Sequence, residues 1–591
     1  MVARLAHRGP DGEWITGDGS ARFGMARLAI RGLESGIQPI VEPHSGVMVV
    51  CNGEIDNHGD LRAFLAERGY TIEQDTDVAV LPGLYLELGE AFVERLAGAY
   101  AIAVWDPRHG GKLLLARDRS GERPLFFRYE NGLATFASQL SAMAAGAPEA
   151  LEIDPAALRR YLQLGHFPAP DSPFAEVRKV GPGEIVAIEP GSVRRERYWR
   201  WPRANPPKTD ISLDAFDTVF REAVRRQSEV DVKFGLFLSG GVDSSLIAAV
   251  AKSLRPDKPL TAYGLRFGED SYDEGQFAER VAAGLSIDYV PVWVKAEDIP
   301  GLLAELVQSV GEPLADPAWV PTALLSRRAS QDIRISLSGE GADELFGGYP
   351  TYFGAGLAER YGRLPAGFRA LIRRAVEIWP PSDKKVTLSF LLKRFVQGDG
   401  LDGLARHVLW TSSVPPAMLE RLGLEPEPVA WSAPSEEILL DRLQHYDLER
   451  PLAEGLLTKA DRGSMLSALE LRAPFLDPAV MDFAAALPPG ERIKGVETKV
   501  FLKRYALRYL PKDIVYRKKR GLSVPIGAWL RGPLRDWAET TLSHPGFVRL
   551  GIDRRELGKI FDEHQRRAAD HARALWALLV LGEWLAWAER Q

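Results

Sequence analysis

Apolar residues in the first 200 positions occur as short runs separated by turn residues, a pattern typical of β-strands. The runs expected as strands cover residues 46–55, 99–105, 112–116, 132–138 and 183–189, and a short helix is expected over 61–69. Between the second and third runs, Asp106–Gly111 has the composition of a hairpin turn. Antiparallel sheets stacked face to face are the natural packing for such strands.

From residue 212 onward the pattern changes to strands that alternate with helices. Strands are expected over 234–238, 260–267, 287–294 and 333–338, and helices over 213–228, 275–285, 297–310 and 319–331. This alternation predicts a parallel, doubly wound sheet with helices on both faces. In such sheets, ligands bind beyond the carboxyl ends of the strands. The remainder, 350–591, is expected to be mainly helical.

The sequence thus divides into two parts with a connector between them. Residues 201–211 contain three prolines and no apolar period, which is typical of an extended linker. We therefore expect one domain over 1–200, a linker over 201–211 and a second domain over 212–591. The predicted fold is an α+β stack of antiparallel sheets, followed by an α/β parallel sheet with a helical C-terminal part.

Composition limits the kinds of partner. Charged residues make up 26% of the 591 residues and the net charge is −6, so no nucleic-acid surface is indicated. The first residues carry charges where a signal peptide needs an apolar core, and the apolar stretch 574–582 is too short to span a bilayer. A single cysteine, Cys51, agrees with a reducing compartment. We expect a cytoplasmic protein with small-molecule ligands, no nucleic acid and no membrane, and a homodimer is left open.

The stretch Lys233–Ser245, read KFGLFLSGGVDSS, has the arrangement of a phosphate-binding turn. Its apolar strand breaks at Ser239-Gly240-Gly241 and a helix follows. Backbone N–H groups at a helix N-terminus bind anions, and glycine lets the backbone come close to them. Asp243 would repel a phosphate unless a cation lay between them, which suggests Mg²⁺. An ordinary strand-to-helix turn is the alternative, and the G-x-x-x-x-G-K loop is absent.

Four stretches carry a resemblance to a known family. SGGVDSS resembles the pyrophosphate-binding loop of the ATP pyrophosphatases. SGEGADELFGGY at 338–349 resembles the second signature of glutamine-hydrolysing asparagine synthetases, and KADRGSMLSALELRAPFLD at 459–477 resembles their third. ETKVFLKRY at 497–505 has a lysine where that family has one that contacts the phosphates. The order of these stretches is more specific than any of them alone.

The resemblance implies an ATP site with a magnesium ion. It places the β,γ-phosphates on Ser239, Gly240, Gly241, Ser244 and Ser245, and the adenosine part on Leu238, Leu265, Ser338 and Gly339. Asp243 and Asp343 would hold Mg²⁺ against the phosphates. Glu340 and Lys499 would be catalytic in forming an acyl-adenylate. For Glu340, Asp343 and Glu344 a solvated helix start is the alternative, since acids suit that position.

The first domain carries a second resemblance. HRGPD at 7–11, RLAI at 27–30, NGEI at 52–55 and TD at 76–77 resemble the class II glutamine amidotransferase domain, which has the αββα fold of the N-terminal-nucleophile hydrolases. By this resemblance the glutamine-binding residues are Arg27 for the carboxylate, Leu28 and Ile30 for the pocket wall, Asn52 and Gly53 for the oxyanion, and Glu54 and Asp77 for the α-amino group.

This second resemblance fails at one point. The family's nucleophile is an N-terminal cysteine whose own α-amine is the base, whereas this sequence starts at Met1, at the helix before HRGPD. Cys51 cannot replace it, because it lies within a strand and has no free amine. Either the recorded start lies downstream of the true one, or the domain has lost glutaminase chemistry and the enzyme uses free ammonia. We favour the first, because every other element of the pocket can be matched.

Taken together, the resemblances imply an ATP-dependent amidation of a carboxylate. L-Aspartate, L-glutamine and ATP would give L-asparagine, L-glutamate, AMP and diphosphate through an acyl-adenylate. Two alternatives stay open: amidation of another carboxylate, such as a sugar acid in surface polysaccharide synthesis, and ring closure of the β-lactam or lasso-peptide type with a degenerate glutaminase domain. A non-catalytic scaffold is opposed by the four charged residues assigned to the ATP site.

Overall fold

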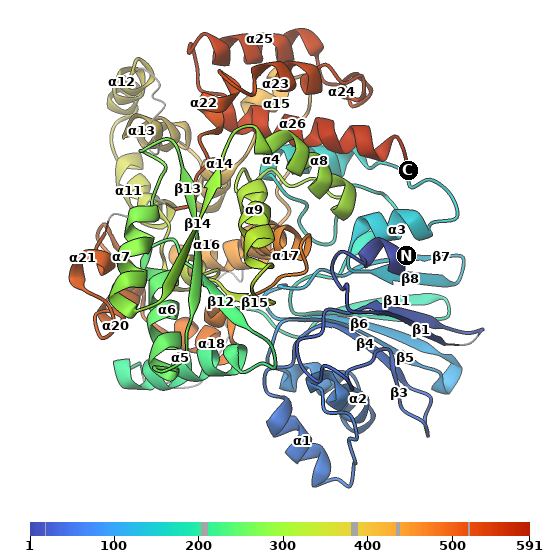
Figure 1. Ribbon diagram of the computed structural model, residues 1–591. Helices are drawn as coiled ribbons and strands as arrows, with labels where there is room; N and C mark the ends of the chain where they lie inside the picture. Colours follow the sequence, from blue (N-terminus) through green and yellow to red (C-terminus); the bar gives the residue numbers. More distant parts are fainter. Residues whose placement is uncertain (18, 202–210, 380–387, 433–437, 518–520) are drawn as a thin grey trace.

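The computed structural model describes residues 1–17, 19–201, 211–379, 388–432, 438–517 and 521–591. The expected linker therefore lies almost wholly outside the described residues. In Figure 1 the N-terminal sheets, in blue and cyan, lie beside a green parallel sheet, and red C-terminal helices cover one end.

The N-terminal part is a stack of antiparallel sheets between helices. Its six-stranded sheet has the order β11-β10-β6-β5-β4-β3, and the strands are β3 (Ile40–Val41), β4 (Met48–Gly53), β5 (Tyr100–Asp106), β6 (Lys112–Arg117), β10 (Glu184–Glu189) and β11 (Ser192–Arg197). The second layer holds the sheet β8-β7-β9 and the hairpin β1-β2, with strands β1 (Glu13–Gly17), β2 (Arg22–Ala26), β7 (Phe126–Glu130), β8 (Leu133–Ala137) and β9 (Arg178–Lys179). This is the αββα arrangement that the sequence predicts.

Strand β4 shows why the sequence of this part contains unbroken apolar runs. Val49 and Cys51 pack into a cluster with the helices α1 (His58–Ala66) and α2 (Leu81–Leu88). Met48 and Val50 face the other way, into the cluster shared with the second layer. Because side chains alternate along a strand, a strand covered on both faces must be apolar at every position.

The second part is built on a five-stranded parallel sheet in the order β14-β13-β12-β15-β16. Its strands are β12 (Phe234–Phe237), β13 (Thr261–Phe267), β14 (Asp288–Val294), β15 (Ile335–Leu337) and β16 (Glu470–Arg472). The chain winds from β12 outward to β14 and returns to β15 on the other side of β12. The sheet therefore has its switch point between β12 and β15, where a ligand site is expected.

Helices cover this sheet much as the sequence predicts. They include α5 (Leu213–Ser228), α6 (Val242–Leu254), α7 (Gly275–Leu285), α8 (Asp298–Val310), α9 (Trp319–Ala329) and α17 (Leu457–Met465). Strand β16 was not predicted: it is a three-residue strand inside the region expected to be helical. It forms only because its backbone pairs with β15, far away in the sequence.

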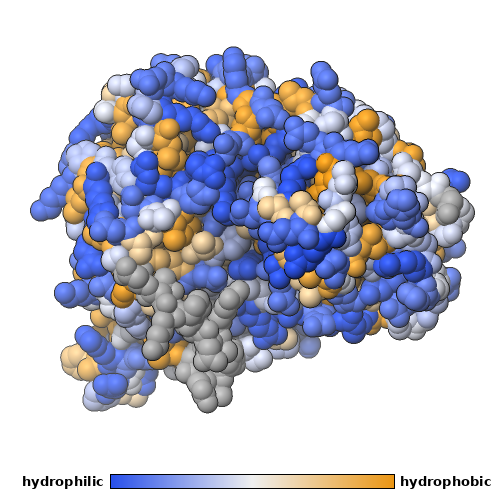
Figure 2. Space-filling view, turned by 90° about the horizontal axis from the view of Figure 1, so that it is seen from below, coloured by the Kyte–Doolittle hydropathy of each residue, from blue (hydrophilic) through white to orange (hydrophobic). Residues whose placement is uncertain are grey.

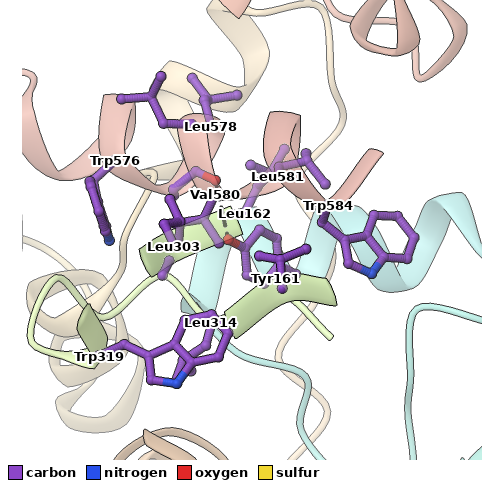
Figure 3. Packing of buried hydrophobic residues seen from close by; sticks show 14 of the residues in the cluster. Tyr161, Leu162, Leu303, Leu314, Trp319, Trp576, Leu578, Val580, Leu581 and Trp584 are labelled. Atoms are coloured by element: carbon purple, nitrogen blue, oxygen red, sulfur yellow. Dashed lines mark hydrogen bonds between the residues drawn. The ribbon is translucent and has the colours of Figure 1, made fainter. Parts of the chain in front are cut away.

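The largest apolar core joins the two parts through the last helix, α26 (Ala572–Ala588). Figure 3 shows Leu578, Leu581 and Trp584 of this helix packed against residues of α8 and of α4 (Pro155–Leu164). The hydroxyl of Tyr161 donates a hydrogen bond to the carbonyl of Ala577 at 3.1 Å. The apolar stretch 574–582 is thus interior packing rather than exposed surface.

Within the described residues, no helix combines the length and the apolar character that crossing a membrane requires. On the face drawn in Figure 2, hydrophilic residues predominate and the apolar areas between them are small.

We expect Leu578→Ala to lower the free energy of unfolding by about 2–5 kcal/mol, because it leaves a cavity in a fully buried site. Denaturant unfolding followed by tryptophan fluorescence measures this loss. Leu371→Ala is the control, since that side chain is 64% exposed and should change stability by less than about 0.5 kcal/mol. Equal losses in the two variants would contradict the packing described here.

Candidate functional site

The turn after β12 begins the helix α6 at the carboxyl edge of the parallel sheet. Gly240 has a φ of 69°, and a Cβ there would lie 2.6 Å from the backbone of Ala278, so only glycine fits. Gly241 is the N-cap of α6. The hydroxyl of Ser244 accepts a hydrogen bond from the backbone N–H of Ser239 at 3.2 Å and closes the turn. Ser245 is fully buried beneath it.

The turn after β15 lies directly beside the first. A Cβ on Gly339 would lie only 3.1 Å from the Cβ of Asp243, so the two turns touch. Gly341 has a φ of 85° and precedes the short helix α10 (Ala342–Phe346). Leu265 lies on the neighbouring strand β13, and Leu238 follows β12. The residues that the sequence assigns to ATP therefore gather around one switch point, from three adjacent strands.

Lys499 joins the two turns. Its Nζ donates a hydrogen bond to Asp243 at 2.5 Å and lies 2.7 Å from a carboxylate oxygen of Asp343. Burial lowers the pKa of Lys499, but the two carboxylates outweigh burial and leave the pKa raised. Lys499 has a φ of 55°. A Cβ on Gly348 would collide with Asp343 and Lys499, so that glycine leaves the space that the pair occupies.

A second ion pair lies beside the first. Lys459, on α17, has its Nζ 3.3 Å from Glu340. Glu344 is buried, and burial together with the nearby Asp343 raises its pKa to about 8. The hydroxyl of Tyr349 donates a short hydrogen bond to Glu344. Sequence reasoning assigned no role to Lys459, although it opens the third family stretch, because its partner is distant in the sequence.

All seven residues assigned to glutamine line one cavity of about 890 Å³ in the N-terminal part: Arg27, Leu28, Ile30, Asn52, Gly53, Glu54 and Asp77. Asn52 donates a hydrogen bond to the hydroxyl of Ser138 at 3.3 Å. A Cβ on Gly53 would lie 2.0 Å from the carbonyl of Ala99, so this position requires glycine. The cavity also touches Met465 and Glu470 of the second part.

Arg27 and Glu54 are the residues of this set with the most telling protein partners. The guanidinium of Arg27 donates to the carbonyls of Arg31, Gly32 and Leu33, at 3.0, 2.7 and 3.1 Å, and so holds that turn.

Glu54 accepts a hydrogen bond from Arg31 at 2.8 Å and lies 3.1 Å from Arg472 of the second part. Burial and the neighbouring Asp77 raise the pKa of Glu54 to about 8. No sequence motif indicated that a residue of the second part reaches this cavity.

Cys51 is unsuited to act as a nucleophile. It is fully buried in β4, and burial raises the pKa of its thiol well above the ordinary value. A thiol reacts as its thiolate, so a raised pKa makes it inert. This agrees with the expectation that Cys51 cannot replace an N-terminal cysteine nucleophile.

The comparisons with known proteins agree with both halves of this description. Residues 215–586 match the family model described as asparagine synthase, and residues 1–199 match the glutamine amidotransferase domain. Asparagine synthetase [glutamine-hydrolyzing] 1 of Bacillus subtilis is 30% identical, over 99% of this chain and 92% of its own length. A putative asparagine synthetase [glutamine-hydrolyzing] of Mycobacterium bovis is 32% identical, over 98% of this chain and 92% of its own length.

More distant likenesses are also found. The amidase chry2 of Gibberella zeae is 25% identical, over 93% of this chain and 88% of its own length. A solved glutamine phosphoribosylpyrophosphate amidotransferase of Bacillus subtilis is 15% identical with a TM-score of 0.25, covering 57% of this chain and 71% of that one. That likeness is too weak to support a conclusion.

The raised pKa of Glu54 gives a prediction about pH. The unfolded carboxyl ionises near its ordinary value, 4.5, whereas the folded one keeps its proton up to about pH 8. The stability this group contributes is therefore present below pH 4.5 and is lost as the pH rises through 8. The Tm of the wild type should fall relative to that of Glu54→Gln between pH 6 and pH 9, measured by scanning calorimetry.

The matched control is Glu67→Gln, because the Glu67 side chain is 78% exposed. Its Tm should follow that of the wild type at both pH values. A constant difference between the wild type and Glu54→Gln across this range would show that Glu54 is ionised throughout.

Proposed function

The chain belongs to the asparagine synthase family, and from this premise we propose that it activates a carboxylate with ATP and converts it to an amide. The observation that carries the proposal is that two Ser-Gly turns meet at adjacent parallel strands. Asp243 and Asp343, one from each turn, both contact the buried ammonium group of Lys499. A parallel sheet binds nucleotides at such a switch point.

In the first step, the substrate carboxylate attacks the α-phosphorus of ATP. The bond to the β-phosphate breaks, diphosphate leaves, and an acyl-adenylate forms. The turn Ser239–Ser245 would hold the departing phosphates with its backbone N–H groups and the N-terminus of α6. Lys499 would neutralise charge that develops on them, and Glu340 with Lys459 would orient the acyl group.

In the second step, ammonia attacks the activated carbonyl, AMP leaves, and the new amide loses a proton. We propose L-aspartate as the carboxylate, so that the product is L-asparagine, as the names of the two bacterial relatives suggest. L-Glutamine would supply the nitrogen from the 890 Å³ cavity, whose wall includes Met465 and Glu470 of the second part. Cys51 has no part in that hydrolysis.

The residues present also fit a magnesium ion. The ammonium group of Lys499 lies within 3 Å of both Asp243 and Asp343, so a positive charge is accommodated between these carboxylates. Asp243 and Asp343 would hold Mg²⁺, which supplies charge neutralisation to the β,γ-phosphates.

Asp243→Asn and Asp343→Asn should each lower carboxylate-dependent diphosphate release below about 1% of the wild-type rate, since each removes a charge that faces the phosphates. A coupled assay for diphosphate, with ATP, ammonium chloride and L-aspartate, measures this. Asp288→Asn is the control, because Asp288 is exposed at the amino end of β14, away from the site. Diphosphate release at the wild-type rate in both site variants would contradict the assignment of these two carboxylates to the ATP site.

Lys499 offers a second prediction, which does not depend on turnover. Because its ammonium group takes the place of a cation between two carboxylates, Lys499→Met should bind Mn²⁺ without nucleotide about tenfold more tightly than the wild type. Electron paramagnetic resonance of free Mn²⁺ measures the affinity. Lys503→Met, on the same helix α20 (Val500–Ala506), should bind like the wild type. Equal Mn²⁺ affinity in all three proteins would place the metal elsewhere.

A further inference from the structure

A second cavity, of about 330 Å³, shares no lining residue with the glutamine cavity and is not used by the steps above. Its wall combines segments that are distant in the sequence. They include His166 of the first part, Asp316 and Thr351 of the second, and Gly455 beside α17. The volume lies in the range of small-molecule sites.

His166 is the most unusual group in this wall. Its side chain is buried, with 6% of the residue exposed, and Nε2 has no hydrogen-bond partner among the described residues. The ring is neutral at pH 7, because burial and the nearby Lys179 lower its pKa to about 3. The hydroxyl oxygen of Thr351 is likewise buried, and no described residue bonds to it. Buried polar groups are normally paired, so these two atoms are available to a ligand.

The helix that borders the cavity has an unusual backbone. Residues Leu448–Leu456 form a π-helical segment, η5, with Pro451 inside it. π-Helical turns are rare and occur mostly at functional sites. The segment runs directly into α17, and Gly455 in the cavity wall stands four residues before Lys459.

Contacts of two wall residues place the cavity next to the adenylation site. Lys459 forms the ion pair with Glu340, and Asp316 of the cavity wall helps to raise the pKa of Lys459. Tyr349, also in the wall, bonds to Glu344. The cavity and the site where the carboxylate is activated therefore share their boundary.

We propose that this cavity receives the body of the carboxylate substrate and that His166 is the specificity residue. This inference rests on the proposed function. In the neutral tautomer with the proton on Nδ1, Nε2 accepts a hydrogen bond, so it selects a substrate that carries a donor, either an ammonium or a hydroxyl group. The carboxylate of Asp316 favours the ammonium form. The substrate class is an amino or hydroxy acid, held with the carboxyl to be activated toward Glu340.

The test compares three acids that differ only in this donor: L-aspartate has an ammonium group, L-malate a hydroxyl group, and succinate neither. Diphosphate release is measured for each with saturating ATP and ammonium chloride. The wild type should prefer L-aspartate and L-malate to succinate. In His166→Phe, which has no acceptor, the KM for L-aspartate should rise about ten- to hundredfold and approach that for succinate, while the KM for ATP stays within about twofold.

His166→Gln is the matched variant, because its amide oxygen can accept a hydrogen bond near the position of Nε2. It should keep the preference for L-aspartate over succinate. Thr351→Val provides an independent variant if His166→Phe is unstable by circular dichroism, and it should raise the KM for L-aspartate without changing that for ATP.

The outcomes separate the two levels of the argument. No diphosphate release by the wild type with any of the three acids would contradict the proposed function itself. Release by the wild type, with succinate used as well as L-aspartate, would overturn the inference about the cavity alone. So would a His166→Phe enzyme that discriminates as the wild type does, or one whose KM values for ATP and L-aspartate rise together.

Discussion

Buried charges between the two parts of the chain impose the constraint on which the rest of the structure depends. Arg117 lies 2.7 Å from Glu454, and Lys179 lies 2.9 Å from Glu454 and 2.6 Å from Glu312, all almost fully buried. Burial opposes ionisation of Glu454, but its cationic partners hold its pKa down to about 2. Removing one partner of a buried pair costs about 3–5 kcal/mol, because it strands the other charge. Each part therefore supplies the counter-charges that the buried charges of the other require.

Arg472 shows how this constraint ties the two sites together. Its backbone carbonyl accepts a hydrogen bond from Ser338 at 2.9 Å, at the turn assigned to ATP. Its side chain lies 3.1 Å from Glu54 in the glutamine cavity and donates to Glu470 at 2.8 Å. A change in the charge of Glu54 thus acts on a residue whose backbone supports the nucleotide turn. One buried residue, Arg472, therefore contacts both sites directly, the nucleotide turn through its backbone and the glutamine cavity through its side chain.

The structural features that depend on local sequence pattern were predicted correctly. The alternation of strands and helices, the stacked antiparallel sheets and the placement of both Ser-Gly turns at strand ends all follow from periodicity and glycine. Strand β16 and the partners of Lys459 and Glu54 did not follow, because long-range contacts create them. Arg27 marks the same limit: its role as a carboxylate ligand stays a prediction, and its motif did not indicate the three backbone carbonyls to which its guanidinium donates. Local sequence tells which groups are present, and packing decides what they meet.

Helix α17 lies between the cavity proposed for the acyl substrate and the cavity proposed for the nitrogen source, and so keeps the two substrates apart. The segment just before its first residue lines the 330 Å³ cavity, and its last residue, Met465, lines the 890 Å³ cavity. A helix of this length separates the two by about 14 Å at 1.5 Å per residue. Lys459 stands between these ends and is paired with Glu340. The two substrates would then approach one carbonyl from opposite ends of a single buried helix. The ion pairs that hold Glu454, in the segment just before α17, against the first part are consequently a condition for the proposed chemistry as well as for the fold.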